Sequence, residues 1–160
     1  MTDHYSTLEA AFRTLAITEL PAYFPAAKAA EMVTKSDDTV YDRGHDYYLT
    51  TYPGAFPVER LGVQSISVGW EILVDLLTRW KGGEAESWDR FILYRSDIFN
   101  LYNVSNKGRN LNRTAGVFSV TFGTVDRPRY IPLIYDNPDS PPAFIAQTCV
   151  ATITEVINKT

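Results

Sequence analysis

The sequence predicts an α+β domain in which a mostly antiparallel, mixed sheet of about four to six strands packs against an N-terminal helix and a central helix. Apolar residues at every second position from 66 to 76 are typical of a half-buried strand. Apolar residues at steps of three and four from 88 to 102 are typical of a helix with one buried face. The 160 residues fit one domain with a single core, so we expect residues 1–160 to fold as one unit.

The first segment is expected to be a helix. Ser6 followed by Glu9 fits a capping box, although Thr2 or Asp3 would equally cap an earlier start. Apolar residues then recur at helical spacing until Pro21 ends the pattern.

Residues 26–61 are less regular. We expect a short helical turn over 26–33 and a strand over Tyr47–Tyr52, where β-forming side chains are frequent. Pro53 and Gly54 close that strand, and a loop or irregular edge is expected at Phe56 and Pro57.

The clearest signal is the alternating segment that begins at residue 66. Continued to Trp80, it makes a strand of about fifteen residues, long against a usual length of about five or six, so part of it is expected to project beyond the sheet. Gly82 and Gly83 end the strand without a phosphate-loop motif around them. A helix is predicted over Ser87–Tyr102, with acidic residues near its start, where the helix dipole favours them.

Residues 103–116 contain four Asn and two Gly with almost no apolar content, and we expect a flexible loop. Residues 117–125 alternate through Phe118, and residues 130–135 are expected to pair back on them as a hairpin. Residues 144–157 are expected to form a last long strand.

Few residues suggest catalysis or metal binding. His45 beside Asp46 is a conceivable oriented base, but a solvated loop histidine is the preferred interpretation. Cys149, inside an apolar strand, is expected to be a buried structural thiol. Two acidic pairs, Asp37 with Asp38 and Asp136 with Asp139, lack a calcium-loop pattern and are interpreted as solvated loop residues. We therefore expect a protein that is not an enzyme and that holds no cofactor and no metal.

Charge and composition narrow the classes of function that remain. The formal net charge of −4 gives no reason to expect tight phosphate binding. Cys149 is alone, so no intramolecular disulfide is expected. The first residues do not resemble a secretion signal, and no apolar run approaches the ~20 residues that cross a bilayer, so we expect folding in the cytoplasm and no membrane partner.

Lys107, Arg109 and Arg113 form a small basic cluster in the Asn-rich segment. Such a cluster contacts a phosphate or an acidic partner, or it only keeps a loop soluble. Both interpretations stay open at this point.

The order of elements resembles that of the tail terminator proteins of long-tailed, lambda-like bacteriophages. The resemblance rests on Gly69–Arg79, on the helix Ser87–Tyr102 and on the closing segment Phe144–Ile153, and it spans most of the chain. Residues 26–61 and 103–116 are extended relative to a minimal member of that family.

The resemblance implies a structural protein of the virion tail, assembled in the host cytoplasm. Members form a ring, typically a hexamer, that caps the finished tail tube, stops its polymerisation and joins it to the head connector. The implied partners are further copies of the chain, the major tail tube protein and the head–tail connector protein, and DNA passes through the ring without sequence-specific recognition.

The candidate contacts with a neighbouring subunit or the tube are Leu77, Arg79, Trp80, Lys107, Arg109 and Arg113. We expect Leu77→Asp to block assembly and to leave the monomer folded. A head–tail connector component of the neck is an alternative function. In a different class, a small-ligand-binding domain or enzyme would form its site from Tyr41, His45, Tyr47 and Tyr52.

Overall fold

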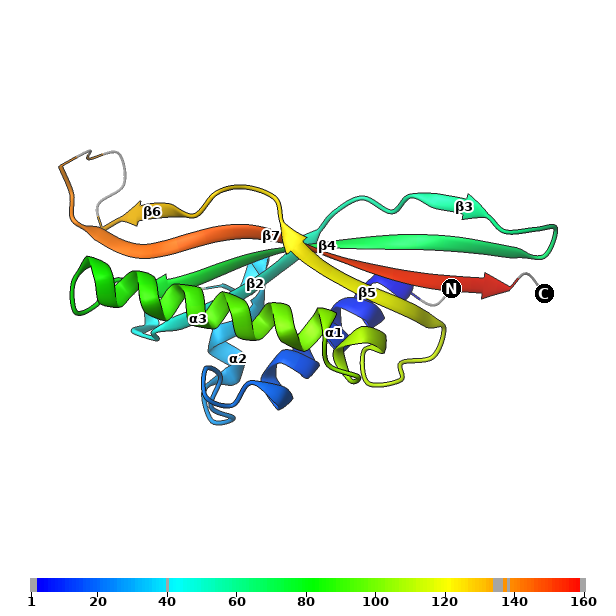
Figure 1. The fold of residues 1–160 in the computed structure, drawn as a ribbon, viewed down its shortest axis with the longest axis horizontal. Coiled ribbons are helices and arrows are strands. Elements are labelled where there is room, and N and C mark those ends of the chain that lie inside the picture. The colour runs from blue at the N-terminus through cyan, green and yellow to red at the C-terminus, as the bar shows by residue number, and fades with distance from the viewer. Residues whose placement is uncertain (1–2, 40, 134–136, 138, 159–160) are drawn as a thin grey trace.

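A computed structural model describes residues 3–39, 41–133, 137 and 139–158 of the chain. Within these residues, one mixed sheet of seven strands carries its α-helices on one face, which confirms the predicted α+β class (Figure 1). The elements are α1 His4–Glu19, α2 Ala29–Met32, β1 Val33–Lys35, η1 Ser36–Asp38, η2 Tyr41–Arg43, β2 Tyr47–Pro53, β3 Val58–Arg60, β4 Ser65–Arg79, α3 Glu84–Asn103, η3 Gly108–Asn110, β5 Val117–Thr124, β6 Arg129–Pro132 and β7 Pro142–Asn158, where η marks a 3₁₀ helix.

The strands follow the order β1-β2-β4-β7-β5, with β3 paired to β4 and β6 paired to β7. The sheet has more strands than the four to six expected, because β1 and β3 have three residues each. Segments that short carry no recognisable alternation. The parallel pairing of β1 with β2 makes the sheet mixed, and every other pair is antiparallel.

Helix α1 starts at His4, with Asp3 as its N-cap, which is earlier than a cap at Ser6 would place it. The Asp3 carboxylate caps it, because Oδ1 accepts a hydrogen bond from the Ser6 backbone N–H at 3.1 Å and Oδ2 accepts one from the Ser6 hydroxyl at 2.6 Å. Ser6 therefore lies in the first turn and is not the cap. A capping carboxylate accepts hydrogen bonds from N–H groups that the helix itself leaves unpaired.

The long alternating strand is present as β4, with 15 residues. It pairs with β7 along its whole length, from Ser65 opposite Asn158 to Arg79 opposite Phe144. The turn after it uses Gly82 and Gly83, whose φ angles of 79° and 97° favour glycine. A Cβ on Gly82 would also lie 2.0 Å from the Glu86 carboxylate. Helix α3 then begins three residues before the predicted start.

The predicted hairpin between residues 117–125 and 130–135 is wrong. Strands β5 and β6 both pair with β7 and lie one after the other along the same edge of it (Figure 1). At 17 residues, β7 is long enough to pair with both. The connection between β5 and β6 is fixed to β7 by a hydrogen bond in which Asp126 Oδ1 accepts from the Thr148 N–H at 2.9 Å. Residues 134–136 of the second predicted segment lie outside the described residues.

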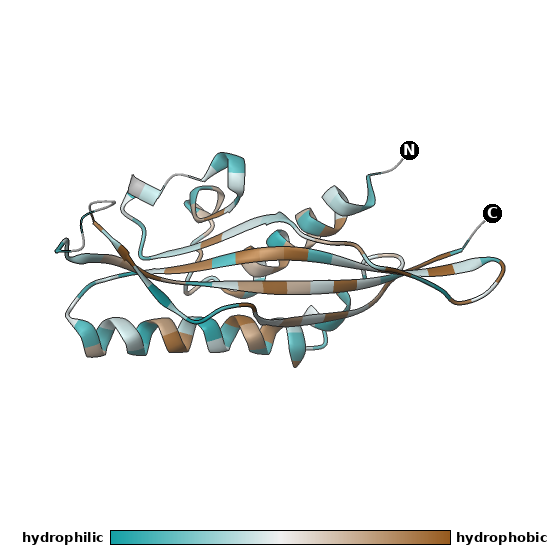
Figure 2. Ribbon diagram, turned by 90° about the horizontal axis from the view of Figure 1, so that it is seen from above, coloured by the Kyte–Doolittle hydropathy of each residue, from teal (hydrophilic) through white to brown (hydrophobic). Residues whose placement is uncertain are grey.

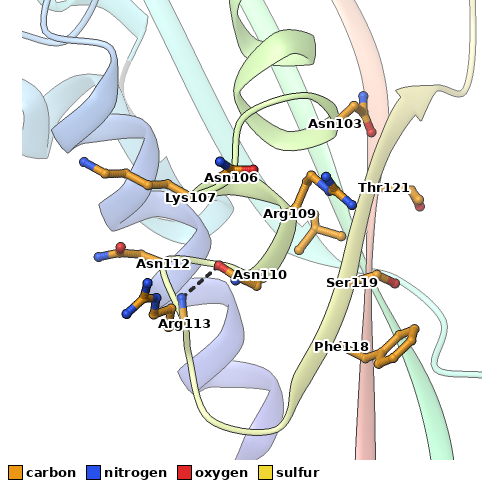
Figure 3. A pocket seen from close by; sticks show the side chains of 11 residues that line it. Asn103, Asn106, Lys107, Arg109, Asn110, Asn112, Arg113, Phe118, Ser119 and Thr121 are labelled. Atoms are coloured by element: carbon orange, nitrogen blue, oxygen red, sulfur yellow. Dashed lines mark hydrogen bonds between the residues drawn. The ribbon is translucent and has the colours of Figure 1, made fainter.

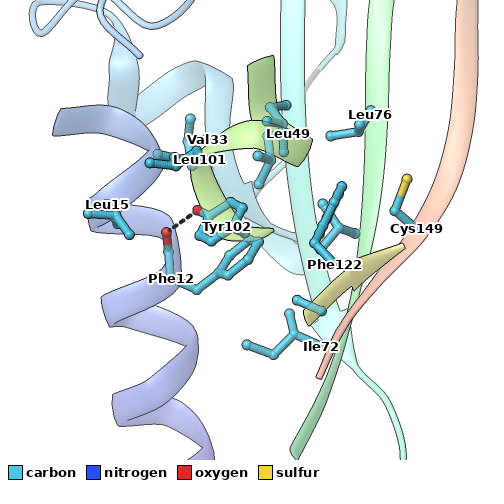
Figure 4. Close-up of a cluster of buried hydrophobic side chains, with 14 of the residues drawn as sticks. Phe12, Leu15, Val33, Leu49, Ile72, Leu76, Leu101, Tyr102, Phe122 and Cys149 are labelled. Carbon is cyan, nitrogen blue, oxygen red and sulfur yellow. Dashed lines mark hydrogen bonds between the residues drawn. The ribbon is translucent and has the colours of Figure 1, made fainter. Parts of the chain in front are cut away.

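The main core lies between the helices and one face of the sheet (Figure 4). At its centre the Phe12 and Tyr102 rings stack with their centroids 4.1 Å apart, and the Tyr102 hydroxyl donates to the Phe12 carbonyl oxygen at 2.7 Å. This bond satisfies a polar group that would otherwise be costly to bury. Helices α1 and α3 are thereby joined to each other at the position where both pack on the sheet.

A second, smaller apolar cluster lies on the opposite face of the sheet. Its buried members are Tyr48, Leu77, Phe144 and Ala146, with Tyr41, Ile131 and Ala143 packed against them. Elements η2 and β6 supply the covering side chains, so both faces of the sheet are buried at this end. Leu77 is only 2% exposed.

At the other end, β3, the first part of β4 and the last part of β7 extend beyond the helices (Figure 1). We call residues 56–67 with 156–158 the arm. The projecting end of the long strand is thus its beginning at Ser65, where β4 pairs with β3 and β7, whereas the end near Gly82 pairs with β2 and β7. The sequence predicted a projection without establishing which end projects, and three of the candidate contacts, Leu77, Arg79 and Trp80, lie at the end that does not project.

Candidate functional site

The three basic residues predicted from the sequence as candidate contacts line one pocket of about 790 Å³ (Figure 3). We call it the basic pocket; it is formed by Lys107, Arg109 and Arg113, by the asparagines at 103, 106, 110 and 112, and by residues 118–121 of β5. The pocket therefore lies where the segment after α3 meets an edge strand of the sheet. Its amides and cations are hydrogen-bond donors suited to carboxylate or phosphate oxygens.

The segment 103–116 was expected to be a flexible loop, but it forms a compact turn around η3. Leu111 anchors the turn in the main core, where it is 3% exposed. Gly108 lets the turn lie against the end of α3, because a Cβ there would be 1.7 Å from the Leu101 carbonyl oxygen. One buried leucine among polar residues gives no periodic signal, so the sequence did not reveal this anchor.

Three consecutive residues of the turn, Leu111, Asn112 and Arg113, have left-handed φ angles of 49°, 55° and 64°. A side chain in this conformation costs about 1–2 kcal/mol, with Asn the best tolerated. The Asn110 Oδ1 atom accepts from the Arg113 N–H at 2.9 Å, and the Thr114 hydroxyl donates to the Leu111 carbonyl oxygen at 2.6 Å. These bonds hold the turn so that Leu111 is buried while Asn112 and Arg113 are exposed.

The cations of the basic pocket differ in their partners. Lys107 Nζ lies 2.8 Å from Glu19 Oε1 of α1, whereas the Arg109 side chain extends the other way, toward β5 (Figure 3). Among the described residues, no carboxylate lies within 4.0 Å of the Arg109 or Arg113 guanidinium. Two exposed positive charges are therefore available to an external partner.

Strand β5 contributes Phe118, which is exposed at the mouth of the pocket. The sequence alternation groups this ring with Val120 and Phe122 on one face of the strand. A register shift between Val117 and Ser119 turns Phe118 outward instead. A bulge of this kind re-aims one side chain without changing the rest of the strand.

Arg79 and Trp80 lie at the far end of α3 from the basic pocket. Arg79 Nε donates to the His45 carbonyl oxygen at 3.0 Å, and its guanidinium carbon lies 4.8 Å from the centre of the Phe144 ring. The Trp80 ring meets the Tyr130 ring edge-on at 5.4 Å. Since α3 has 20 residues and is about 30 Å long, the six candidate residues do not form one surface.

An acidic surface at the start of α3 was not predicted as a site. Glu84, Glu86 and Asp89 are exposed there, and we call them the acidic end. Beside them, Trp88 Nε1 donates to the Tyr130 hydroxyl at 2.9 Å, which in turn lies 3.3 Å from Glu84 Oε1. The sequence showed these carboxylates only as partners of the helix dipole, because Tyr130 comes from a distant strand.

Leu77 does not belong to an accessible surface, because it is buried in the second cluster. The reason is that η2 and β6 cover this face of β4. The proposed ligand site of Tyr41, His45, Tyr47 and Tyr52 is not assembled either. Tyr47 contacts the Tyr23 ring at 4.9 Å on the helical face, whereas the Tyr52 hydroxyl reaches Asp75 Oδ1 at 3.4 Å on the other face. Alternation along β2 separates the two rings.

His45 is buried, contrary to the solvated interpretation. Its Nε2 atom lies 2.6 Å from Glu31 Oε2, and Arg43 Nη1 lies 3.4 Å from Glu31 Oε1. The hydrogen bond with His45, followed by the charge of Arg43, lowers the pKa of the Glu31 carboxyl below its usual value. Glu31 belongs to helix α2 and lies fourteen residues before His45 in the sequence, and this contact explains the burial of His45.

Cys149 is buried in the main core, as predicted. Burial raises the pKa of its thiol to about 12, so the nucleophilic thiolate is disfavoured. Asp37 and Asp38 are exposed in η1, and Asp136 lies outside the described residues. Within the described part of the chain, no three His, Cys, Asp or Glu side chains gather as a metal site requires.

No known protein family matches this sequence, and no characterised protein is significantly similar to it. Across the described residues, no helix has both the length and the apolar character needed to cross a membrane. The basic pocket, the acidic end and the arm are the features from which a function is inferred.

Proposed function

We propose that this chain is a ring-forming subunit of the tail terminator type, which caps the tail tube of a long-tailed bacteriophage and joins it to the head connector. The supporting observation is the arm, a narrow β-ribbon that extends beyond the helices (Figure 1). It carries exposed apolar side chains at Phe56, Val58, Leu61 and Val63.

These four exposed apolar side chains fall within eight positions of the sequence, on and beside strand β3. Scattered exposed apolar residues are normal, but a contiguous apolar patch marks an interaction surface. Val63 at the tip of the arm is 93% exposed, and hydrophobic residues along the arm are brown in Figure 2. A narrow ribbon gains stability when its apolar side chains are covered, and a neighbouring subunit or the tube supplies that cover.

The arrangement of the remaining elements supports the same proposal. The long strand β4, the glycine turn, helix α3 and the long closing strand β7 occur in the order on which the resemblance to tail terminators rests. The arm gives such a subunit a reach beyond its own core, which a ring or a tube cap requires from each copy.

The test is the assembly state of the purified protein, measured by light scattering after size-exclusion chromatography and by negative-stain electron microscopy. We expect a ring, either alone or after mixing with tail tubes. Val63→Asp should abolish ring formation and leave the thermal unfolding curve unchanged. Leu93→Asp, on the exposed face of α3, is the matched control and should assemble normally.

A wild-type protein that stays monomeric with and without tail tubes would overturn the proposal. Binding to head connectors but not to tubes would instead support the alternative neck component.

A further inference from the structure

We infer that the basic pocket of one copy binds the acidic end of α3 of the next copy, so that subunits join head to tail. This inference rests on the proposed ring and adds the pair of surfaces through which neighbouring copies recognise one another. The partner it specifies is a second copy of this chain.

Complementary charge is the first support. The basic pocket presents Arg109 and Arg113 without a described carboxylate within 4.0 Å. The acidic end presents Glu84, Glu86 and Asp89, and among the described residues no Lys, Arg or His nitrogen lies within 4.0 Å of their carboxylates. Both surfaces therefore carry charges that the subunit itself does not neutralise.

The cations nearest to the acidic end are already engaged. Lys81 Nζ lies 3.6 Å from the Asp46 carboxylate, and the Arg90 guanidinium donates to the Arg79 carbonyl oxygen. Neither of these cations therefore forms an ion pair with the acidic end.

The chemistry of the two surfaces also matches. A guanidinium binds a carboxylate through two parallel hydrogen bonds and stacks on aromatic rings. The acidic end offers both, because Trp88 and Tyr130 lie beside Glu84 and are hydrogen-bonded to each other. The pocket adds asparagine amides as further donors to carboxylate oxygens.

The positions of the surfaces favour a ring. They lie at opposite ends of α3, which has 20 residues and is about 30 Å long, so one copy cannot close the contact on itself. A contact between two different patches is heterologous, and repeated heterologous contacts close into rings when the rotation allows. A two-fold symmetric contact through either patch would bring like charges together, which is unfavourable.

The test uses two full-length variants with reversed charges. Arg109→Glu/Arg113→Glu makes the pocket acidic, and Glu84→Arg/Glu86→Arg makes the other end basic. We expect each alone to weaken self-association by about 100-fold, as loss of close charge pairs does. Mixing the two variants should restore assembly, because each altered surface then meets its complement. Assembly of the mixture and of the wild type should both weaken as the salt concentration rises.

Lys28→Glu/Lys35→Glu is the matched control, with the same change of charge at two exposed cations near α2. It should assemble as the wild type does. Sedimentation velocity gives the association, and thermal unfolding checks that each variant is folded. If the wild type assembles only on tail tubes, the same comparison is made with tubes present.

Three results would overturn the inference and leave the ring proposal standing. In the first, the pocket variant still assembles like the wild type. In the second, each variant fails to assemble alone and the mixture fails as well. In the third, the variants assemble but no longer bind tubes, which makes the tube protein the occupant of the pocket. A wild type that never assembles contradicts the ring proposal itself.

Discussion

The side-chain amide of Asn103 pairs with the backbone of Phe122. Asn103 Nδ2 donates to the Phe122 carbonyl oxygen at 2.8 Å, and the Phe122 N–H donates to Asn103 Oδ1 at 2.8 Å. Strand β5 is the last strand on that side of the sheet, so its outer backbone groups lack a partner strand. The last residue of α3 takes the place of that strand at one position and blocks an edge that would otherwise be open to pairing with another chain.

Asn103→Ala should lower the free energy of unfolding by about 1–3 kcal/mol, because it leaves a donor and an acceptor at Phe122 without these partners. Urea unfolding followed by circular dichroism measures the change. Asn106→Ala is the control, since Asn106 is exposed and lines the same pocket. Equal stability of the two variants would show that the paired amide contributes nothing.

Leu77→Asp should destabilise the monomer by about 3–5 kcal/mol, because it replaces a buried side chain of the second cluster with a carboxylate. This replaces the expectation from sequence that the variant would fold and fail only in assembly. Leu93→Asp makes the same change at a leucine that is 59% exposed and should cost less than about 1 kcal/mol. A folded Leu77→Asp monomer of wild-type stability, measured by urea unfolding, would be incompatible with the burial described.

The Glu31–His45 contact should make stability depend on pH. The pKa of the Glu31 carboxyl is lower in the folded protein than its ordinary value of 4.5, chiefly because of the hydrogen bond with His45. The stabilisation is therefore complete above pH 4.5 and is lost as pH falls through the lower folded-state pKa. Unfolding of Glu31→Gln and wild type across this range should show a difference that shrinks in acid.

Glu59→Gln on the exposed strand β3 is the control for that experiment and should follow the wild-type pH dependence. A Glu31→Gln deficit of constant size at every pH would mean that the carboxylate charge is not responsible.

The Cys149 thiol should be unreactive in the folded protein. Burial excludes reagents, and it raises the thiol pKa to about 12, so little thiolate forms at mildly alkaline pH. A thiol-specific chromogenic reagent should label the protein only after denaturation. Val63→Cys places a thiol at the exposed tip of the arm and should react at once in the folded state. Rapid labelling of the folded wild type would contradict the buried position.

Local periodicity predicted the elements well. Strand β4 and helix α3 were found because apolar residues repeat at regular spacing over 66–76 and over 88–102. The basic pocket was partly predictable for a related reason, since its three cations lie within seven positions of one another and one turn brings them together. Features that depend on residues close together in the sequence could therefore be predicted.

Contacts between segments that are far apart in the sequence could not be predicted. The sequence predicted a β segment at residues 130–135 without identifying β7 as the partner of β6. It also gave no reason to bury Leu77, because the cover over that face comes from η2 and β6. The acidic end became recognisable as a site only when Tyr130 was placed beside Glu84.

Strand β7 is the last strand in chain order, yet it pairs with β4, β5 and β6. During synthesis, β4 has a long unpaired edge until residues as far as 158 have left the ribosome. Pairings across such long sequence separations form slowly and leave strand edges exposed meanwhile. The sheet therefore remains incompletely paired until β7 has been made, and the arm is completed last, because its outer pairs join Ser65 and Ile66 to Asn158 and Ile157.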